Sequence, residues 1–349
     1  MQNYNTAAGR INKLKGEILG HAIPVEVIGT AGAMNKEMPK KVGDTVVYRR
    51  WLPYGGTDNK WIVPSTGDAA AVFAAAHLTT EGVTPNADTL APVDVTVTLN
   101  EYSVLYSLSN RTVDLHEDDI PAEMKKQTGQ RVGLVREMVR YGALKACTNK
   151  FYAGGGATRA SVNTKITLGL LRKVARALQS SHAERITSIL SASPNFATTP
   201  VEAGYTVYGH TDIAPDVRDL PGFKHVSEYG QRKPLNEYEI GSCEEFRFML
   251  SPELAPILDG GALVGATGMV ANATNVDVYP IIMMADNAYG QVALRGMNAV
   301  NPTYIPPGQK DKNDPLGQRG YIGALTYFNA TVLNNGWMAV AEVGTSVLV

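Results

Sequence analysis

Two runs of alternating residues, separated by a long stretch rich in turns, constrain the fold of this chain more than any other feature. The first run starts at Val42, and the second starts at Val93 and continues through Tyr102 to Leu108. About forty residues containing repeated Gly and Pro lie between them. Two strands joined in this way predict a projecting hairpin. Because an isolated two-stranded ribbon is marginal in water, this ribbon is expected to need a partner surface.

The residues of the first run do not separate into an apolar and a polar face. Alternation assigns the odd-numbered positions from Thr45 to Trp51 to one face and the even-numbered positions from Val46 to Leu52 to the other. Both sets mix apolar and polar side chains, so neither reads as a deep core face. The first forty residues are polar and interrupted by Gly and Pro, which is typical of an arm: a solvated tether or a strap across a neighbouring subunit.

The clearest helix signal follows the second run. Acidic residues 117–119 and Pro121 suit a helix start, and an apolar or small stripe then recurs at steps of three and four from Met124 to Gly142. Between Pro121 and Lys150 there are seven basic and two acidic residues. This excess predicts either a solvated helix face or contact with acidic partners or enclosed nucleic acid.

The remainder of the chain mixes helices and strands without regular alternation. A second helix is expected from Thr164, as the N-cap, to Ser181, and a brief helix at Ser251. Short strands are expected between these two helices, among them 246–250, and beyond them, the last two being 321–333 and 338–343. Because the elements do not form successive βαβ units, the fold class is α+β rather than a doubly wound parallel sheet.

No constellation of residues supports catalysis, a cofactor or a metal. The glycine loop at 260–267 has Ala266 where a phosphate-binding loop needs lysine. Dispersed groups such as His210, Asp212 and Asp216 leave an enzyme as a rival interpretation, but Asp216 to Asp219 reads more simply as a capped turn. Cys147 and Cys243 are expected to be reduced thiols.

The charge and hydropathy of the chain exclude further classes. A net charge of -1 gives no large excess of cations for nucleic-acid binding, and 19% charged residues fits a surface covered largely by other protein. The most apolar stretch, residues 69–76, is far shorter than the roughly 20 residues that cross a bilayer, and we see no signal peptide, so we expect a soluble protein made in a reducing cytoplasm.

Several motifs, in order along nearly the whole chain, resemble one family of tailed-phage major capsid proteins, typified by the capsid protein of coliphage N-four. These motifs are residues 38–45 with Tyr48-Arg49-Arg50-Trp51, residues 81–85, Leu220-Pro221-Gly222-Phe223, residues 286–290 and, most specifically, residues 314–320. Residues 58–78 have no counterpart in the pattern.

The resemblance implies the Hong Kong 97-type viral capsid fold. It implies an N-terminal arm at 1–41, an extended β-hairpin loop at 42–109, a peripheral domain at 110–160 and 300–333 with a spine helix from about 117 to 150, and an axial domain at 161–299 and 334–349.

The function implied is structural rather than enzymatic. The chain would form hexamers and pentamers that close into an icosahedral shell around double-stranded DNA, bound without sequence specificity. Scaffolding, portal and decoration proteins would be its other partners, and the virion capsid, assembled in the host bacterial cytoplasm, its location. The alternative is an encapsulin-like compartment that encloses cargo enzymes.

The residues expected to make inter-subunit contacts are arginines and large aromatic side chains of the ribbon, together with the 314–320 motif. Such side chains dominate protein interfaces in general, while an exposed arginine without a partner is the alternative at each basic position. The set is Arg49, Arg50, Trp51, Tyr54, Trp61, Asp314 and Arg319.

Overall fold

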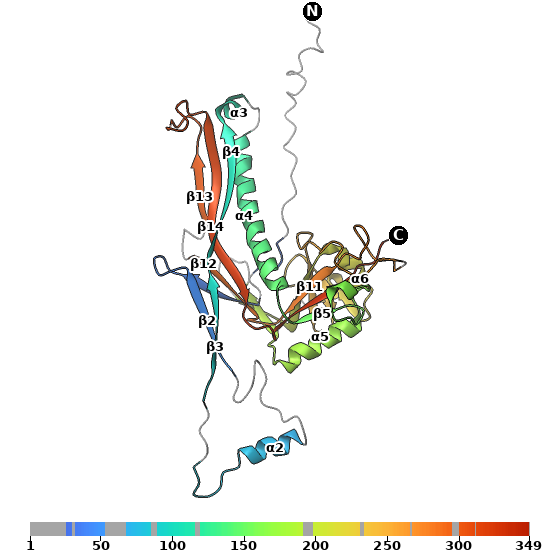
Figure 1. Ribbon diagram of the computed structural model, residues 1–349. Coiled ribbons are helices and arrows are strands. Elements are labelled where there is room, and N and C mark those ends of the chain that lie inside the picture. Colours follow the sequence, from blue (N-terminus) through green and yellow to red (C-terminus); the bar gives the residue numbers. More distant parts are fainter. Residues whose placement is uncertain are drawn as a thin grey trace, which may run out of the picture.

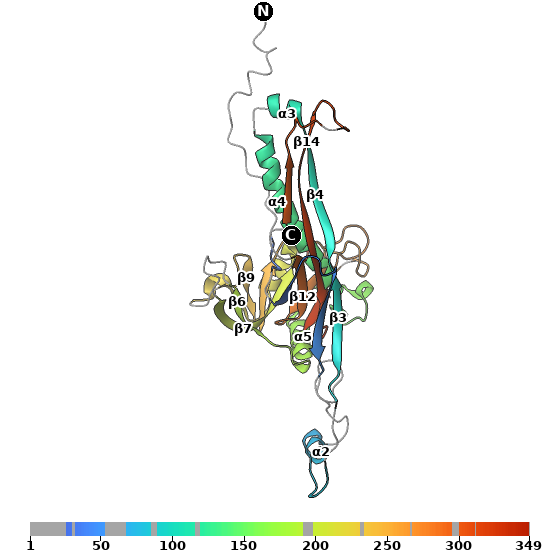
Figure 2. The ribbon, with the colours of Figure 1, turned by 90° about the vertical axis from the view of Figure 1, so that its left-hand side faces the viewer.

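The computed structural model describes residues 26–29, 32–52, 68–84, 89–115, 119–190, 198–230, 234–265, 267–294, 300–310 and 312–348. Figures 1 and 2 show three parts. They are a long extension of helix and strands, called the arm from here on and not the segment 1–41, a body beside the base of that arm, and a ribbon that points away from it. The mixture of helices with two large mixed sheets confirms the α+β class.

The arm is built around one long strand, β14 (Arg319–Val332). Strand β4 (Asn100–Ser109) pairs with β14 over ten residues, and β13 (Val300–Ile305) and β12 (Tyr289–Leu294) pair with separate portions of it. Strand β1 (Ala33–Met38) adds to β12 in parallel and completes a five-stranded sheet. The arm and the region where it meets the body therefore share a single strand.

Helix α4 (Ile120–Lys145) packs along the arm sheet (Figure 1). Its N-cap is Asp119, whose Oδ1 accepts a hydrogen bond from the Ala122 amide at 3.1 Å. The helix is shorter at both ends than the range of 117–150 expected from the sequence. Thr128 and Val132 of the expected stripe are buried. Further along, the buried positions are Glu137, Arg140, Tyr141 and Leu144, a change of face that the apolar stripe did not predict.

The body is an eight-stranded sheet. Its strands, in spatial order, are β5 (Lys150–Tyr152), β15 (Met338–Val343), β11 (Tyr279–Met284), β7 (Thr198–Gly209), β10 (Phe246–Leu250), β9 (Glu239–Cys243) and β8 (Phe223–His225), with β6 (Ile186–Leu190) paired to β7. Every residue of β10, β11 and β15 is buried, as expected for mainly apolar runs in the centre of a sheet, and the buried residues include one charged side chain in each of β10 and β15, Arg247 and Glu342. The main hydrophobic core lies here.

Two helix predictions for the body need correction. Helix α5 (Leu168–Ser180) begins later than expected, because its N-cap is Thr167, whose Oγ1 accepts the Leu170 amide at 3.3 Å, and not Thr164. No helix forms at Ser251: its hydroxyl accepts the Glu253 amide at 3.1 Å in a turn, and Pro256 would interrupt the first turns of a helix. Short helices are α3 (Asn110–Leu115) and α6 (Ala214–Arg218).

The ribbon consists of β2 (Thr45–Trp51) and β3 (Pro92–Thr98) in antiparallel register. The second run of the sequence splits at Leu99: β3 pairs with β2, whereas β4 leaves the ribbon and pairs with β14. The expectation that neither ribbon face is a core face was wrong. The Tyr48 hydroxyl donates to the carbonyl oxygens of Gln291 at 2.9 Å and Met34 at 3.1 Å, so the ribbon base packs on its own chain.

The far side of the ribbon leads to helix α2 (Ala69–Ala76), which lies beyond the ribbon at the end of the molecule opposite the arm tip (Figures 1 and 2). Within the described ranges, no helix has both the length and the apolarity needed to cross a membrane.

Candidate assembly surfaces

The outer face of the ribbon presents four cross-strand pairs to solvent. Thr45 lies opposite Thr98, Val47 opposite Thr96, Arg49 opposite Asp94 and Trp51 opposite Pro92. The Trp51 residue is 57% exposed. A valine and a large aromatic side chain thus share one exposed face, with the Arg49–Asp94 pair between them, and exposed aromatic and arginine side chains are enriched at interfaces.

Arg49 forms a bidentate ion pair within this face. Its Nε and Nη2 donate to the two carboxylate oxygens of Asp94 at 2.7 and 2.8 Å. The hydrogen bond from Arg49 lowers the pKa of Asp94. The expected role of Arg49 between subunits remains a prediction, because in the chain alone the guanidinium is already paired across the ribbon.

The other predicted ribbon residues fall in different surroundings. Arg50 lies on the opposite face, where it lines a polar cavity of about 800 Å³ between the ribbon, the end of α5 and the turn at residues 334–336. Tyr54 and Trp61 lie outside the described residues. The structure therefore brings Arg49 and Trp51 onto one face, and directs Arg50 away from them.

Asp314 shapes the loop at the arm tip. Its Oδ2 accepts the backbone amide of Arg319 at 2.8 Å, and backbone amides of Arg319, Gln318 and Gly317 together lower the pKa of its carboxyl group. Gly317 has φ of +66°, a conformation that suits glycine. Asp314 is thus satisfied inside its own loop, while Arg319 opens β14 at an exposed position.

Arg319→Ala is expected to leave this loop intact, because the bond to Asp314 comes from the backbone amide. Asp314→Ala removes the acceptor and is expected to release the loop. Amide hydrogen exchange at residue 319 should therefore accelerate in Asp314→Ala and stay slow in Arg319→Ala. Sedimentation should show weakened assembly for Arg319→Ala with unchanged circular dichroism. A change in subunit folding for that variant would move Arg319 to an internal role.

The basic excess of α4 is largely accounted for by aromatic rings of the arm sheet. Cations on an aromatic face are attracted by the ring quadrupole. Four side chains of α4 lie over sheet rings: Lys125 over Tyr304 at 4.1 Å, Arg131 over Tyr106 at 5.7 Å, and Arg136 and Arg140 over Phe328 at 5.7 and 5.0 Å. These contacts help to hold the helix on the sheet, and contact of the basic residues with acidic partners or enclosed nucleic acid remains a prediction.

A buried ionic network joins α4 to the segment that precedes β1. Glu137 is fully buried, and its Oε1 accepts the amides of Val27 and Ile28, each at 2.8 Å. Its Oε2 accepts from Arg140 Nη1 at 3.4 Å, and Arg140 Nε donates to Gln291 at 2.9 Å. Sequence reasoning missed this network, although Glu137 is the lone acid between Met124 and Lys150.

A second buried carboxylate, in the body, forms ion pairs with basic residues of two other segments. Glu342 on β15 is fully buried, and its two oxygens accept from Nε and Nη2 of Arg159, each at 2.7 Å. Lys150 Nζ lies 3.7 Å from the same carboxylate. The pair raises the pKa of Arg159. These contacts connect β15 and β5 to the loop before α5.

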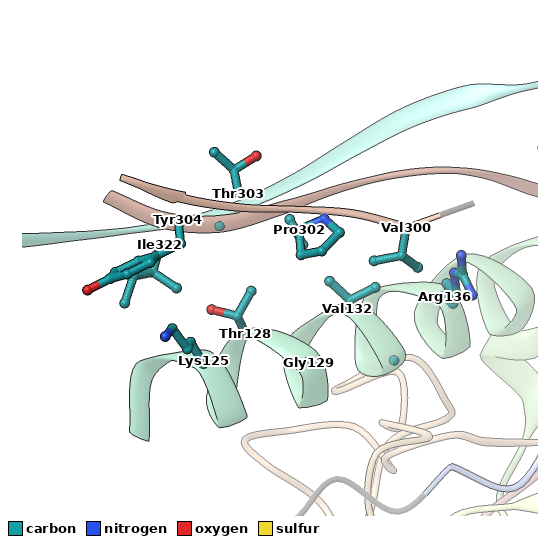
Figure 3. A pocket seen from close by; sticks show the side chains of 13 residues that line it. Lys125, Thr128, Gly129, Val132, Arg136, Val300, Pro302, Thr303, Tyr304 and Ile322 are labelled. Atoms are coloured by element: carbon teal, nitrogen blue, oxygen red, sulfur yellow. The ribbon is translucent and has the colours of Figure 1, made fainter. Parts of the chain in front are cut away.

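A groove runs between α4 and the strands β13 and β14 (Figure 3). Its volume is about 640 Å³. Val132, Val300 and Pro302 line its centre, and Lys125 and Arg136 also line it, one toward each end of the helix segment that it follows. The groove is thus apolar inside, with a basic side chain toward each end, and the Glu26 carboxylate lies against Gly133 beside Arg136.

The groups considered for catalysis have structural partners. Asp212 accepts the Tyr279 hydroxyl at 3.0 Å, and its amide donates to His210 Nδ1 at 3.1 Å. Asp216 accepts from the amide and the hydroxyl of Ser346. Among the residues that the structure describes, no three His, Cys, Asp or Glu side chains are grouped as metal ligands. Both cysteines are buried, which raises the pKa of each thiol.

Comparisons with known proteins bear on the fold. No protein-family model matches the chain. The major capsid protein of Pseudomonas phage KPP21 is 19% identical over 264 residues, which cover 70% of this chain and 66% of that protein. A chain of the capsid of Ralstonia phage GP4 has a TM-score of 0.65 at 12% identity, covering 95% of this chain and 94% of that chain. A chain of the head of Helicobacter pylori bacteriophage KHP40 has a TM-score of 0.61 at 11% identity, covering 99% and 98%. Since these structural matches run over nearly the whole length of both chains, this chain has the fold of phage capsid proteins.

Proposed function

We propose that the chain is a phage major capsid protein whose copies assemble into a closed shell. The observation that carries this proposal is the match, over nearly the full chain, to chains of two phage capsids. The ribbon and the arm extend away from the body and leave apolar side chains such as Trp51 and Val47 exposed. Exposed apolar surface on a well-packed protein is typical of a protein-binding site.

The finer proposal is a Hong Kong 97-type subunit that forms hexamers and pentamers around double-stranded DNA. In this assignment β2 and β3 belong to the extended loop, α4 is the spine helix, and the eight-stranded sheet is the axial domain. Each subunit would contact several neighbours, so individually weak contacts would add up through multivalency. Membership of the coliphage N-four family, and partnership with scaffolding, portal and decoration proteins, belong to the same proposal.

Phage capsids are favoured over an encapsulin compartment because the matched relatives and structures are phage proteins. An enzyme built on His210, Asp212 and Asp216 is disfavoured because those side chains already serve turns and hydroxyl groups. The structure thus gives a specific use to each group that the enzyme interpretation would need.

The proposal predicts closed shells from the purified protein. Negative-stain microscopy at rising protein concentration is expected to show hollow particles of uniform size, and sedimentation should show them in place of the 37.4 kDa monomer. Cargo enzymes copurifying with nucleic-acid-free shells would favour the encapsulin alternative. A strictly monomeric protein at high concentration would overturn self-assembly altogether.

A further inference from the structure

Helix α2 is an exposed element made wholly of apolar residues. Its sequence is Ala-Ala-Ala-Val-Phe-Ala-Ala-Ala, and Val72 and Phe73 are 46% and 42% exposed. Helices shorter than about 12 residues are marginal in water without tertiary packing. A helix that is apolar all round is normally a buried one. Helix α2 therefore has the composition of a packed element and the surroundings of a surface one.

The groove beside α4 is an apolar surface that could receive an exposed apolar helix such as α2. Its walls are the helix segment between Lys125 and Arg136 and strands β13 and β14. Gly129 contributes no side chain to it, and an added Cβ there meets no atom within 4 Å, which allows another backbone to come close. A volume of about 640 Å³ lies within the range of roughly 300–1,000 Å³ of sites that enclose a compact ligand. A phenylalanine and its small neighbours fit such a space.

The two features lie at opposite ends of the molecule. The groove follows the arm, and α2 lies beyond the ribbon, which points the other way (Figures 1 and 2). A chain with its ribbon in this direction does not cover its own groove with α2. The occupant that the geometry allows is α2 of a second copy.

The charges of the two surfaces are complementary. The described stretch that contains α2, residues 68–84, carries Asp68 and Glu81 and no Lys or Arg. Asp68 is exposed beside the helix, where it caps the Ala70 amide at 3.0 Å. The groove has Lys125 and Arg136 toward its ends. An acidic segment around an apolar helix thus meets an apolar groove with a cation, Lys125, at the end away from Glu26.

We propose that α2 of one copy packs into the α4–β13 groove of a neighbouring copy, with Phe73 as its anchor between Val132 and Pro302. The proposal rests on self-assembly and specifies one contact of it. It also gives a role to residues 58–78, which have no counterpart in the sequence motifs discussed above.

Disulfide cross-linking between two single variants tests this contact. Ala70→Cys places a thiol on the same face of α2 as Phe73 and keeps that anchor, and Gly129→Cys places one in the groove, where an added Cβ meets no atom within 4 Å. The two variants are mixed as subunits, assembled and oxidised. A disulfide-linked dimer is expected from the mixture and from neither variant alone. The native thiols are both buried and should stay reduced.

Lys126→Cys is the matched control, since Lys126 is exposed on α4 but does not line the groove. Cross-linking to residue 70 is expected to be at least tenfold weaker there than at residue 129. Normal shells with equal or absent cross-linking at both positions would overturn this contact and leave the proposed function standing. If neither variant nor the parent protein forms shells, the proposed function and this contact fail together.

A pair of acidic substitutions gives a second readout. Phe73→Asp is expected to lower the yield of shells at least tenfold at fixed protein concentration, while Val83→Asp, in the same exposed stretch but outside α2, should leave the yield unchanged. Maleimide labelling of Gly129→Cys should be fast in subunits and slow in shells. Equal labelling in both states would show an open groove and contradict the proposal.

Discussion

Replacing residues 53–90 by an Asn-Gly dipeptide is expected to abolish shell formation and leave the subunit folded. Trp51 pairs with Pro92, and the Leu52 amide donates to the Ala91 carbonyl at 3.0 Å. Residues 52 and 91 are therefore in the register that a two-residue hairpin turn would join. The replacement removes α2 and its flanking segments but keeps β2, β3 and the Tyr48 contacts at the ribbon base.

Sedimentation and negative-stain microscopy measure the loss of shells, and circular dichroism with thermal unfolding measures the fold. The matched control is the same hairpin closure with α2 retained in a shortened loop. If the variant without residues 53–90 assembles with normal yield, the loop is not an element of the contact between subunits. If its unfolding temperature falls instead, the loop stabilises its own chain.

Glu137→Ala is expected to be among the most destabilising single substitutions in the chain. The change leaves the buried amides of Val27 and Ile28 without their acceptor and the buried guanidinium of Arg140 without its carboxylate. Removing one member of a buried ion pair costs about 3–5 kcal/mol of unfolding free energy. Denaturant unfolding of dissociated subunits should show a lower midpoint, and amide exchange at residues 27 and 28 should accelerate.

Lys126→Ala is a suitable control for this measurement, because Lys126 is exposed on the same helix and alanine is a good helix former. Its unfolding free energy should change by less than about 0.5 kcal/mol. A Glu137→Ala subunit as stable as the Lys126→Ala subunit would show that the segment before β1 is held by its apolar contacts and not by the carboxylate.

The sequence predicted best those elements whose conformation depends on residues close to them along the chain. Strands Phe246–Leu250 and Met338–Val343 were predicted to the residue, because each is a mainly apolar run bounded by turns, with a single charged residue, and a run of that length suits a central strand. The buried side of α5, which includes Leu171 and Val174, followed from its spacing for the same reason.

The errors arose where a distant segment decides the local conformation. Thr164 is not a cap because its carbonyl accepts the Gly344 amide at 2.9 Å, which holds the chain extended beside the C-terminal segment. Tyr48 is buried because it packs against β1 and β12, where its hydroxyl donates to the carbonyl oxygens of residues 34 and 291. Alternation within β2 contains no information about residues so far along the chain.

The candidate contact residues were less predictable than the fold. An arginine in a sequence can form an ion pair with a neighbouring subunit or with an acid of its own chain. In this chain Arg49 pairs with Asp94 across the ribbon. The groove beside α4 has no sequence signature, because its walls come from residues near 130, 302 and 323 and exist only once β14 is in place. Helix α2 was visible as an apolar stretch, but its exposure was not.

The continuity of β14 makes the arm a lever. Its 14 residues run without a break from the tip loop to the turn at 333–337, a length of roughly 45 Å at about 3.3 Å per residue. A rotation of about 5° at the base of the arm, where β12 and α4 also join it to the body, would therefore move the tip by about 4 Å. Small changes in how the base packs on the body would thus change the angle between adjoining molecules, and with it the curvature and diameter of the particle that they form.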